Sequence, residues 1–199
     1  MKEITAAREN EDSGEDYFKN LFNSCSSLME LIVNIPQPVI AEVDGVATAA
    51  GCQLVASCDL AIASHESKFA TPGVNIGLFC STPMVALSRN VNKKNAMEML
   101  LTGDFINAEK AKEIGLINNT APKREKLTIE VSKLAEKIAS KSSMTVSIGK
   151  KAFYAQAEMD LSKAYKYTSK TMRKNLLKYD AKEGINAFIE KRSPEWKDE

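Results

Sequence analysis

A dense run of small side chains is the feature that most constrains how this chain can fold. Residues 45–64 hold 13 Gly, Ala, Ser, Thr or Cys residues in 20 positions. They follow an apolar run at 39–43, which predicts a short buried strand, and an Asp-Gly turn signal. The pattern then predicts a helix within 49–58 and a second strand at 60–63. This order forms an α/β unit whose small side chains let the backbones approach closely.

Helical periodicity dominates the rest of the sequence. Apolar residues recur at i, i+3 and i+4 spacing over 13–34, which predicts an amphipathic helix with Ser13 as its N-cap. A short helix is predicted to begin at Asn107 and to end before Gly115, which is suited to the C′ position. Longer helices are predicted at 124–140, 144–157, 160–179 and 181–191.

These patterns divide the chain into three parts. We expect a solvated tail at 1–12, an α/β core at 13–122 and a helical C-terminal region at 123–199. The length of 199 residues is enough for a sizeable core, and the 44% hydrophobic and 27% charged residues exclude a disordered chain. The chain has no uninterrupted apolar run of about 18 residues, so we expect no membrane span.

Charge is unevenly distributed along the chain. The formal net charge is only +1, which argues against a nucleic-acid partner. Residues 1–90 nevertheless hold 5 basic and 11 acidic side chains, whereas residues 91–199 hold 22 basic and 15 acidic ones. The cationic half could hold a small anionic ligand, or it could be a solvated lysine-rich surface.

The metal-ligating residue types are too sparse for a metal site. The single histidine, His65, has no second ligand at metal spacing, and no two cysteines form a C-x-x-C pair. We therefore expect neither a zinc site nor a disulfide framework, but buried thiols in a reducing compartment. The four cysteines are Cys25, Cys52, Cys58 and Cys80.

The segment 44–53 is the most specific candidate for a site. A strand leads through a turn into a helix N-terminus that carries no bulky side chain. The first N–H groups of a helix have no acceptor within it and lie at the positive end of its dipole. Such donors can bind a carbonyl oxygen or oxyanion, usually worth about 2.7–4 kcal/mol per donor. The alternative is a helix packed tightly on a sheet for structural reasons alone.

Several motifs, taken together, resemble the crotonase (enoyl-CoA hydratase/isomerase) superfamily, and within it a mitochondrial branch of enoyl-CoA hydratase-like proteins. The match runs in the right order from residue 18 to residue 197. The motifs that carry it are Ile-Ala-Glu-Val-Asp-Gly at 40–45, Ala-Ala-Gly-Cys-Gln-Leu at 49–54, Ser-Cys-Asp-Leu-Ala-Ile-Ala at 57–63, Lys-Phe-Ala-Thr-Pro at 68–72, Leu-Thr-Gly at 101–103 and Glu-Gly-Ile-Asn-Ala-Phe-Ile-Glu-Lys-Arg at 183–192.

The resemblance implies a fold, a ligand and an assembly. The fold would be a crotonase (ClpP-like) spiral of ββα units followed by a helical region that packs homotrimers or dimers of trimers. The ligand would be a coenzyme A thioester used in mitochondrial fatty-acid metabolism, with no tightly bound cofactor. Members of this family polarise the thioester carbonyl between two backbone N–H groups and so stabilise an enolate.

The resemblance also assigns roles to individual positions. The second oxyanion donor corresponds to Ala50, beside Gly51. Phe188 and Lys191 match positions that contact the adenine and phosphate of CoA, although Phe188 as a core anchor and Lys191 as a solvated charge remain the alternative. The residues that correspond to the acyl pocket are Thr48, Pro72, Phe79 and Cys80.

Three departures from the family pattern bear on activity. The two glutamates that act as acid and base correspond to Gln53 and Gly73, and each such group typically supplies about 10²–10⁴-fold in rate. Ordinary hydration should therefore be absent or very weak. In the family, the first oxyanion donor lies on an N-terminal segment that ends in a Gly-x-Asp-Leu-Lys-Glu-like motif. Only Lys2-Glu3 of that motif remains here, which implies a truncated chain without its upstream strands and transit sequence. Cys80 is either a nucleophile or, without a base nearby, a buried apolar side chain.

Two functions remain open at this point. One is an enoyl-CoA hydratase-like acyl-CoA-binding protein that stabilises a thioester enolate. The other is a non-catalytic acyl-CoA-binding, regulatory or scaffold homotrimer that keeps the fold without the chemistry.

Overall fold

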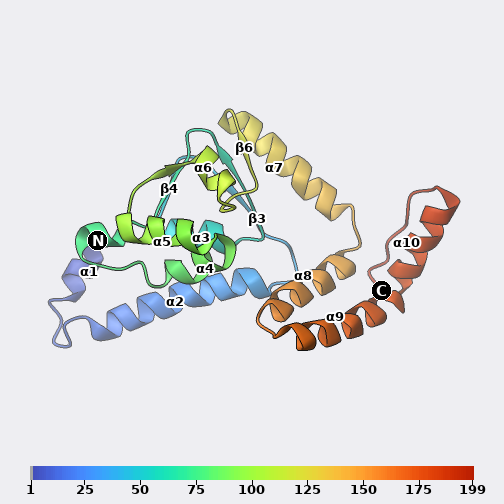
Figure 1. Cartoon of the computed structure of the whole chain (residues 1–199), viewed down its shortest axis with the longest axis horizontal. Coiled ribbons are helices and arrows are strands. Elements are labelled where there is room, and N and C mark those ends of the chain that lie inside the picture. The colour runs from blue at the N-terminus through green and yellow to red at the C-terminus, as the bar shows by residue number, and fades with distance from the viewer. Residues whose placement is uncertain (1) are drawn as a thin grey trace. The chain divides into compact units, whose positions relative to one another are not determined.

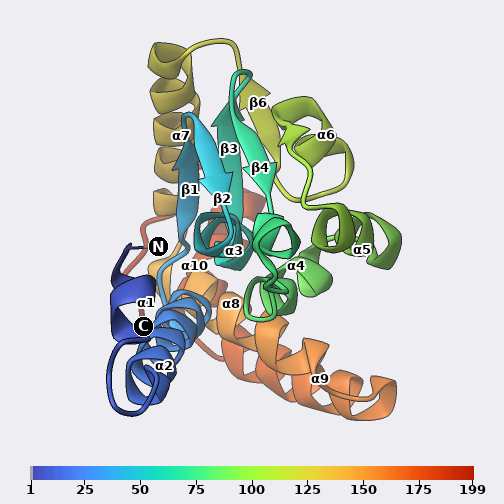
Figure 2. The same ribbon diagram turned by 90° about the vertical axis from the view of Figure 1, so that its left-hand side faces the viewer.

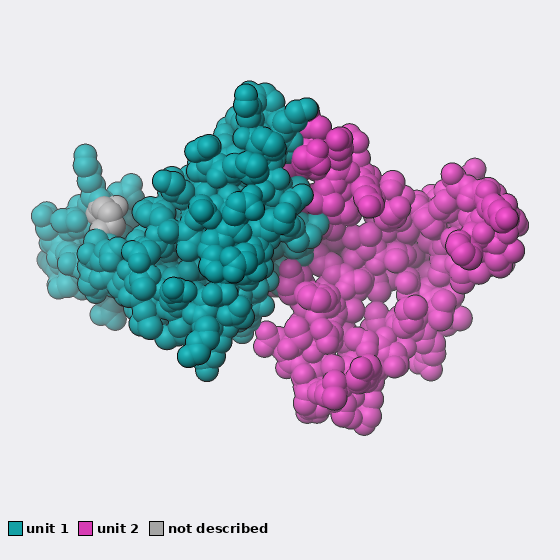
Figure 3. Space-filling view, turned by 45° about the horizontal axis from the view of Figure 1, so that its top comes forward, with its two compact units in different colours: residues 1–33, 41–127 teal, residues 34–40, 128–199 magenta. Residues whose placement is uncertain are grey.

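The computed structural model describes residues 2–199 and contains two compact units. The first unit comprises residues 1–33 and 41–127, and the second comprises 34–40 and 128–199 (Figure 3). The first unit holds almost all of the β-structure and the second is helical (Figure 1). The predicted boundary at 122/123 lies a few residues before this division at 127/128.

Six short strands form two three-stranded sheets in the first unit (Figure 2). One sheet has the order β1-β3-β6 and the other β2-β4-β5, so the first four strands alternate between the two sheets, whereas β4 and β5 lie in the same sheet. Strand β2 pairs in parallel with β4, and β3 pairs in parallel with β6, whereas β5 runs antiparallel to β4. The strand bounds are β1 Ile40–Val43, β2 Val46–Thr48, β3 Leu60–Ser64, β4 Lys68–Ala70, β5 Ile106–Asn107 and β6 Asn119–Ala121.

Small side chains allow the helix α3 to pack closely with both sheets. Its neighbours in the core include Ala47, Ala61, Ala63 and Phe69, each at most 7% exposed. The helices of this unit are α1 Lys2–Ala7, α2 Glu15–Asn34, α3 Ala50–Ser57, α4 Pro83–Asn90, α5 Lys93–Thr102 and α6 Ala108–Glu113, with a 3₁₀ helix η1 at Pro72–Ile76. The predicted α/β unit at 39–64 is confirmed, with strands and helix within one or two residues of their expected positions.

The start of α2 differs from the sequence prediction. Ser13 is not the N-cap, because it has φ 56° and the helix begins two residues later. The Asp12 carboxylate instead accepts hydrogen bonds from the N–H groups of Gly14 and Asp16, both at 2.9 Å. The segment 1–12, expected to be a solvated tail, includes α1 with Ala7 buried, although most of its described side chains are exposed.

The second unit consists largely of four helices whose positions agree with the prediction to within three residues. They are α7 Arg124–Ala139, α8 Ser143–Ala157, α9 Leu161–Leu176 and α10 Tyr179–Glu190. Side-chain caps fix two starts, since Ser142 accepts from the N–H of Thr145 and Asp160 from that of Lys163, both at 3.1 Å. No helix in the described part of the chain is both long and apolar enough to cross a membrane.

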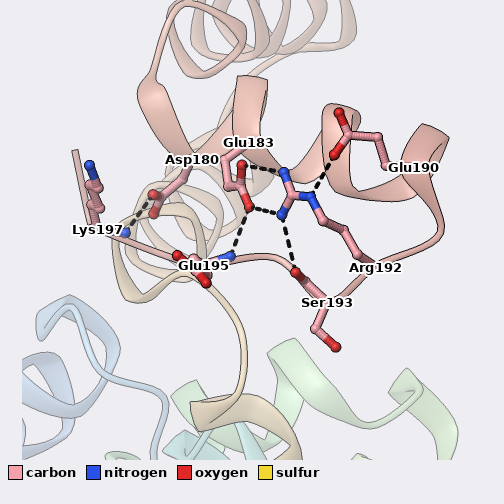
Figure 4. Close-up of polar contacts among 7 residues, drawn as sticks. All are labelled: Asp180, Glu183, Glu190, Arg192, Ser193, Glu195 and Lys197. Carbon is pink, nitrogen blue, oxygen red and sulfur yellow. Dashed lines mark hydrogen bonds and ion pairs between the residues drawn. The ribbon is translucent and has the colours of Figure 1, made fainter.

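A polar network holds the C-terminal tail against α10 (Figure 4). Arg192 donates two hydrogen bonds to the Glu183 carboxylate, at 2.6 and 2.9 Å, and one to Glu190 at 2.6 Å. The buried Asp180 accepts from the N–H groups of Lys197 at 2.8 Å and Asp198 at 3.1 Å. Bidentate pairing and bonds to backbone N–H groups restrict the tail to one path.

Trp196 also holds the C-terminal tail against α10. The indole N–H of Trp196 donates to the Ser140 carbonyl at 2.9 Å, and a Cβ at Gly184 would lie 3.1 Å from the indole ring. Glycine at 184 therefore lets the ring lie against α10. Trp196 is the only tryptophan in the chain, so its fluorescence reports on this contact.

Acid and a single substitution should each release the tail. The hydrogen bonds from Arg192 and from the N–H of Glu195 lower the pKa of Glu183 from 4.5 to about 2. Its contribution to stability is therefore complete above about pH 4.5 and is lost as the pH falls towards 2.

Glu183→Gln should shift Trp196 emission to longer wavelength at neutral pH, because an amide cannot pair bidentately with Arg192. Unchanged emission would contradict the network, and Glu130→Gln, which removes only an exposed pair with Lys133, is the matched control.

Candidate functional site

The turn between β2 and α3 places a helix N-terminus at the end of a sheet. Ala49 donates its N–H to the Ala70 carbonyl of β4 at 3.0 Å, which continues the β2–β4 pairing by one residue. Ala49 then adopts φ 47° and ψ −112°, a conformation that costs a residue with a Cβ about 1–3 kcal/mol. The chain turns at this residue, and α3 begins at Ala50.

The first turn of α3 offers free donors at this point. The N-cap residue, Ala49, makes no side-chain cap, so the first N–H groups are left without intrahelical acceptors. Ala50 is exposed and Gly51 half-buried, and neither carries a side chain that could cover the donors. Ala50 and Gly51 thus lie in the uncapped first turn of α3, and their role as oxyanion donors stays a prediction.

Gln53 lies one turn further along α3 and is only 4% exposed. Its Oε1 accepts a weak hydrogen bond from the Cys25 thiol of α2 at 3.6 Å, and its backbone carbonyl accepts from the Ser57 hydroxyl at 2.8 Å. An amide does not exchange a proton near neutral pH. Gln53 is thus a neutral, buried side chain and not an acid or base.

Gly73 lies in a space that has no room for a side chain. Its carbonyl accepts from the N–H of Leu78 at 2.9 Å, and its N–H donates to the Cys80 thiol at 3.3 Å. A Cβ at this position would lie 2.6 Å from the Leu78 carbonyl oxygen and 2.9 Å from Cys80 Sγ. The loop 77–80 therefore occupies the space into which a side chain at position 73 would project.

Cys80 is buried, at 7% exposure, and belongs to the same apolar core as Cys52. Burial, with a smaller contribution from the charge that Cys80 would carry as a thiolate, raises the pKa of Cys52 to about 12. Cys52 is therefore a neutral thiol at physiological pH. The hydrogen bond from Gly73 and the core packing support Cys80 as a packing residue of the site.

The expected acyl-pocket residues lie on two neighbouring segments. Thr48 pairs with Ala70 at the end of β2, and Pro72 follows two residues later at the start of η1. Thr48 and Pro72 are half-buried and Phe79 is 42% exposed, so these three remain accessible, unlike Cys80. Their contact with an acyl chain stays a prediction.

The two segments that form the site carry no charged side chain. Residues 45–58 provide β2, the turn and α3, and residues 69–88 provide the end of β4, η1 and the Cys80 loop. Neither segment contains an Asp, Glu, Lys, Arg or His residue. The sequence prediction treated Gln53 and Gly73 as separate positions and missed the lack of charge along both segments, although the sequence itself contains this signal.

The two expected CoA contacts lie in the second unit, on and after α10. Phe188 is 85% exposed, so the alternative that it anchors the core is wrong. Lys191 ends the helix in the left-handed region at φ 56°, where glycine is usual. In residues 2–199, no three His, Cys, Asp or Glu side chains come close enough to hold a metal ion.

Adding a methyl group at Gly73 should destabilise the first unit. Gly73→Ala forces the Leu78 carbonyl to move, and we expect the free energy of unfolding in urea to fall by about 1–3 kcal/mol, as overpacking typically does. Gly149→Ala is the matched control, since a Cβ there has no neighbour within 4 Å. It lies inside α8 and should stabilise the protein by roughly 0.5–1 kcal/mol. Equal effects of the two substitutions would refute the tight packing at Gly73.

Comparison with known proteins agrees with this architecture. The family model described as enoyl-CoA hydratase/isomerase matches residues 4–199. The rat enoyl-CoA hydratase domain-containing protein 3, named as mitochondrial, is 53% identical over 98% of this chain. The human protein of that name is 52% identical over the whole chain. The chain covers 63% and 64% of the lengths of these two relatives, which is less than two thirds.

Solved structures extend the similarity to three dimensions. The crystal structure of human enoyl Coenzyme A hydratase domain-containing protein 3 superposes with a TM-score of 0.90 at 53% identity, over 95% of this chain and 74% of that one. An enoyl-CoA hydratase from Mycobacterium smegmatis gives 0.88 at 49% identity, over 91% and 70%. The mitochondrial location implied by the resemblance agrees with the names of the rat and human relatives. The chain belongs to the enoyl-CoA hydratase/isomerase family and has the crotonase fold.

Proposed function

We propose that this chain is an enoyl-CoA hydratase-like acyl-CoA-binding protein of mitochondrial fatty-acid metabolism. The thioester carbonyl would bind the backbone N–H groups of Ala50 and Gly51. The observation that carries this proposal is the uncapped N-terminus of α3, which follows Ala49 in its strained conformation and bears no covering side chain. A thioester enolate carries negative charge on the same oxygen, so these donors would stabilise it more strongly than the neutral carbonyl.

Exposure and charge in the second unit support binding of the CoA moiety. Phe188 offers an exposed aromatic face for adenine, and Lys191 offers an ammonium for phosphate. Lysine at 191 keeps a left-handed conformation that glycine would adopt more easily, which is consistent with a role for its side chain. Helix α9 adds five basic residues and no acidic ones.

The same unit supports the proposal of a homotrimer or a dimer of trimers. Large apolar side chains are exposed on the isolated chain, including Leu161 at 74%, Leu177 at 83% and Ile189 at 71%. Exposed apolar area of this kind is typical of surfaces that bind another protein.

Binding of acetyl-CoA tests the CoA contact directly. Lys191→Gly should weaken the affinity measured by calorimetry about tenfold or more, because a hydrogen bond to a charged group usually contributes about 1.5–3 kcal/mol. The same substitution should leave the melting temperature unchanged or raise it, since glycine relieves the left-handed backbone. Lys137→Gln, on α7, is the control for loss of one positive charge. Equal affinities for the wild type and Lys191→Gly would remove Lys191 from the ligand site.

A non-catalytic acyl-CoA-binding or scaffold homotrimer is the second candidate. Gln53 and Gly73 favour it, because neither can carry a proton and the loop 77–80 leaves no space for a carboxylate at 73. Both candidates predict that crotonyl-CoA hydration, followed by loss of enoyl absorbance, stays close to the background rate. Robust hydration by the purified chain would contradict the assignment of these two positions and would exclude the scaffold.

A further inference from the structure

Helix α9 presents an apolar stripe to solvent. The helix packs against α8, and Ala164 is its only buried residue. Four large apolar side chains recur at i, i+4, i+11 and i+15, a spacing that places them along one side of a helix. They are Leu161, Tyr165, Met172 and Leu176, and each is more than half exposed. A continuous apolar stripe on a solvated helix indicates a binding surface.

The same segment is strongly cationic. Residues 161–178 contain six basic side chains and no acidic one. Five of the six lie in α9, and all five are exposed: Lys163, Lys166, Lys170, Arg173 and Lys174. Among the described residues, Lys163 is the only one of these five that pairs with a carboxylate, that of Asp160 at 2.9 Å. Most of this positive charge is therefore available to an anionic partner.

A groove continues this surface beyond the end of α9. It has a volume of about 390 Å³ and lies between the end of α9 and the start of α10. Its lining includes the apolar side chains of Leu176, Leu177 and Ile185 together with Lys178 and Lys182. Both lysines are exposed, and within residues 2–199 neither forms an ion pair. Apolar walls with two ammonium groups suit a phospholipid, which has apolar chains and a phosphate.

We propose that α9 and this groove bind the surface of an anionic phospholipid bilayer. The helix lies in the interface, with the apolar stripe among the acyl chains and the basic side chains at the lipid phosphates, as cationic amphipathic helices do. The inference goes beyond the proposed function and does not use the thioester site. It agrees with the finding that no described helix can cross a membrane, because such a helix lies on the bilayer rather than spanning it.

Composition favours a lipid surface over another protein or a nucleic acid. Protein interfaces are depleted in lysine, whereas four of the five basic residues of α9 are lysines. A second copy that docked through the same face would bring unpaired cations together. A nucleic acid would pair with the cations but would leave Leu161, Met172 and Leu176 without an apolar partner.

Flotation with vesicles tests the proposal directly. The purified 199-residue chain is mixed with vesicles of phosphatidylglycerol and phosphatidylcholine in equal parts, and with vesicles of phosphatidylcholine alone. We expect flotation with the anionic vesicles only. Raising the salt concentration from about 0.1 M to about 1 M shortens the Debye length from about 10 Å to about 3 Å and should weaken binding at least tenfold. Equal binding to both kinds of vesicle, or binding to neither, would overturn the proposal.

Two double variants separate the contributions of charge and apolar contact. Lys166→Gln with Arg173→Gln should weaken binding about tenfold or more, the usual effect of losing two charges near an anionic surface. Lys126→Gln with Lys137→Gln, on α7, is the matched control and should leave binding unchanged. Leu161→Gln with Met172→Gln should also weaken binding at least tenfold, while the melting temperature stays nearly the same because both side chains are exposed. Binding that survives in both α9 variants would overturn the assignment to this helix.

Light scattering distinguishes a membrane surface from a subunit interface. Leu161 and Leu177 are also among the side chains that the proposed assembly would cover, so the two uses exclude each other. We expect both α9 variants to keep the oligomeric state of the wild type while losing the vesicles. A wild-type oligomer that does not float, and that dissociates on Leu161→Gln with Met172→Gln, would overturn the proposal and assign the stripe to contacts between copies of the chain.

Discussion

The pairing of β2 with β4 is the interaction on which the site depends. It continues by one hydrogen bond, from the N–H of Ala49 to the carbonyl of Ala70, and that bond holds Ala49 in a conformation that an alanine would otherwise avoid. The strained residue directs the chain out of the sheet and into α3, which begins at the exposed Ala50. Small side chains in β2 and α3 allow the close packing of these two elements.

The second unit is organised by polar contacts rather than by a large apolar core. In its helices α8, α9 and α10, the buried side chains are few, and one of them is the carboxylate of Asp180. Burial alone would raise the pKa of Asp180, but the N–H groups of Lys197 and Asp198 and the Ser142 hydroxyl lower it overall. The C-terminal tail is thus held by ionised groups, so its packing depends on pH.

The sequence predicts the long elements well and the short ones poorly. Helices of 12 to 20 residues repeat their apolar pattern several times, whereas β2, β4 and β5 have two or three residues and no measurable period. The N-cap of α2 differs from the prediction because the carboxylate of Asp12, three residues before the helix, reaches the first turn through the turn at Gly14. At the site, the sequence resemblance predicts that Gln53 and Gly73 stand where the family has glutamates. Only the structure explains Gly73, since the clashing atom is the Leu78 carbonyl.

The clash between a side chain at position 73 and the Leu78 carbonyl also limits which substitutions the chain can accept. A glutamate introduced at position 73 would collide with the main chain of the loop 77–80, so a single substitution cannot place a carboxylate here while the loop keeps its position. The loop would have to move first, and that movement would break the hydrogen bond from the Gly73 N–H to the Cys80 thiol. Any side chain at position 73 therefore requires a matching change in the loop 77–80, so these two parts of the chain can change only together.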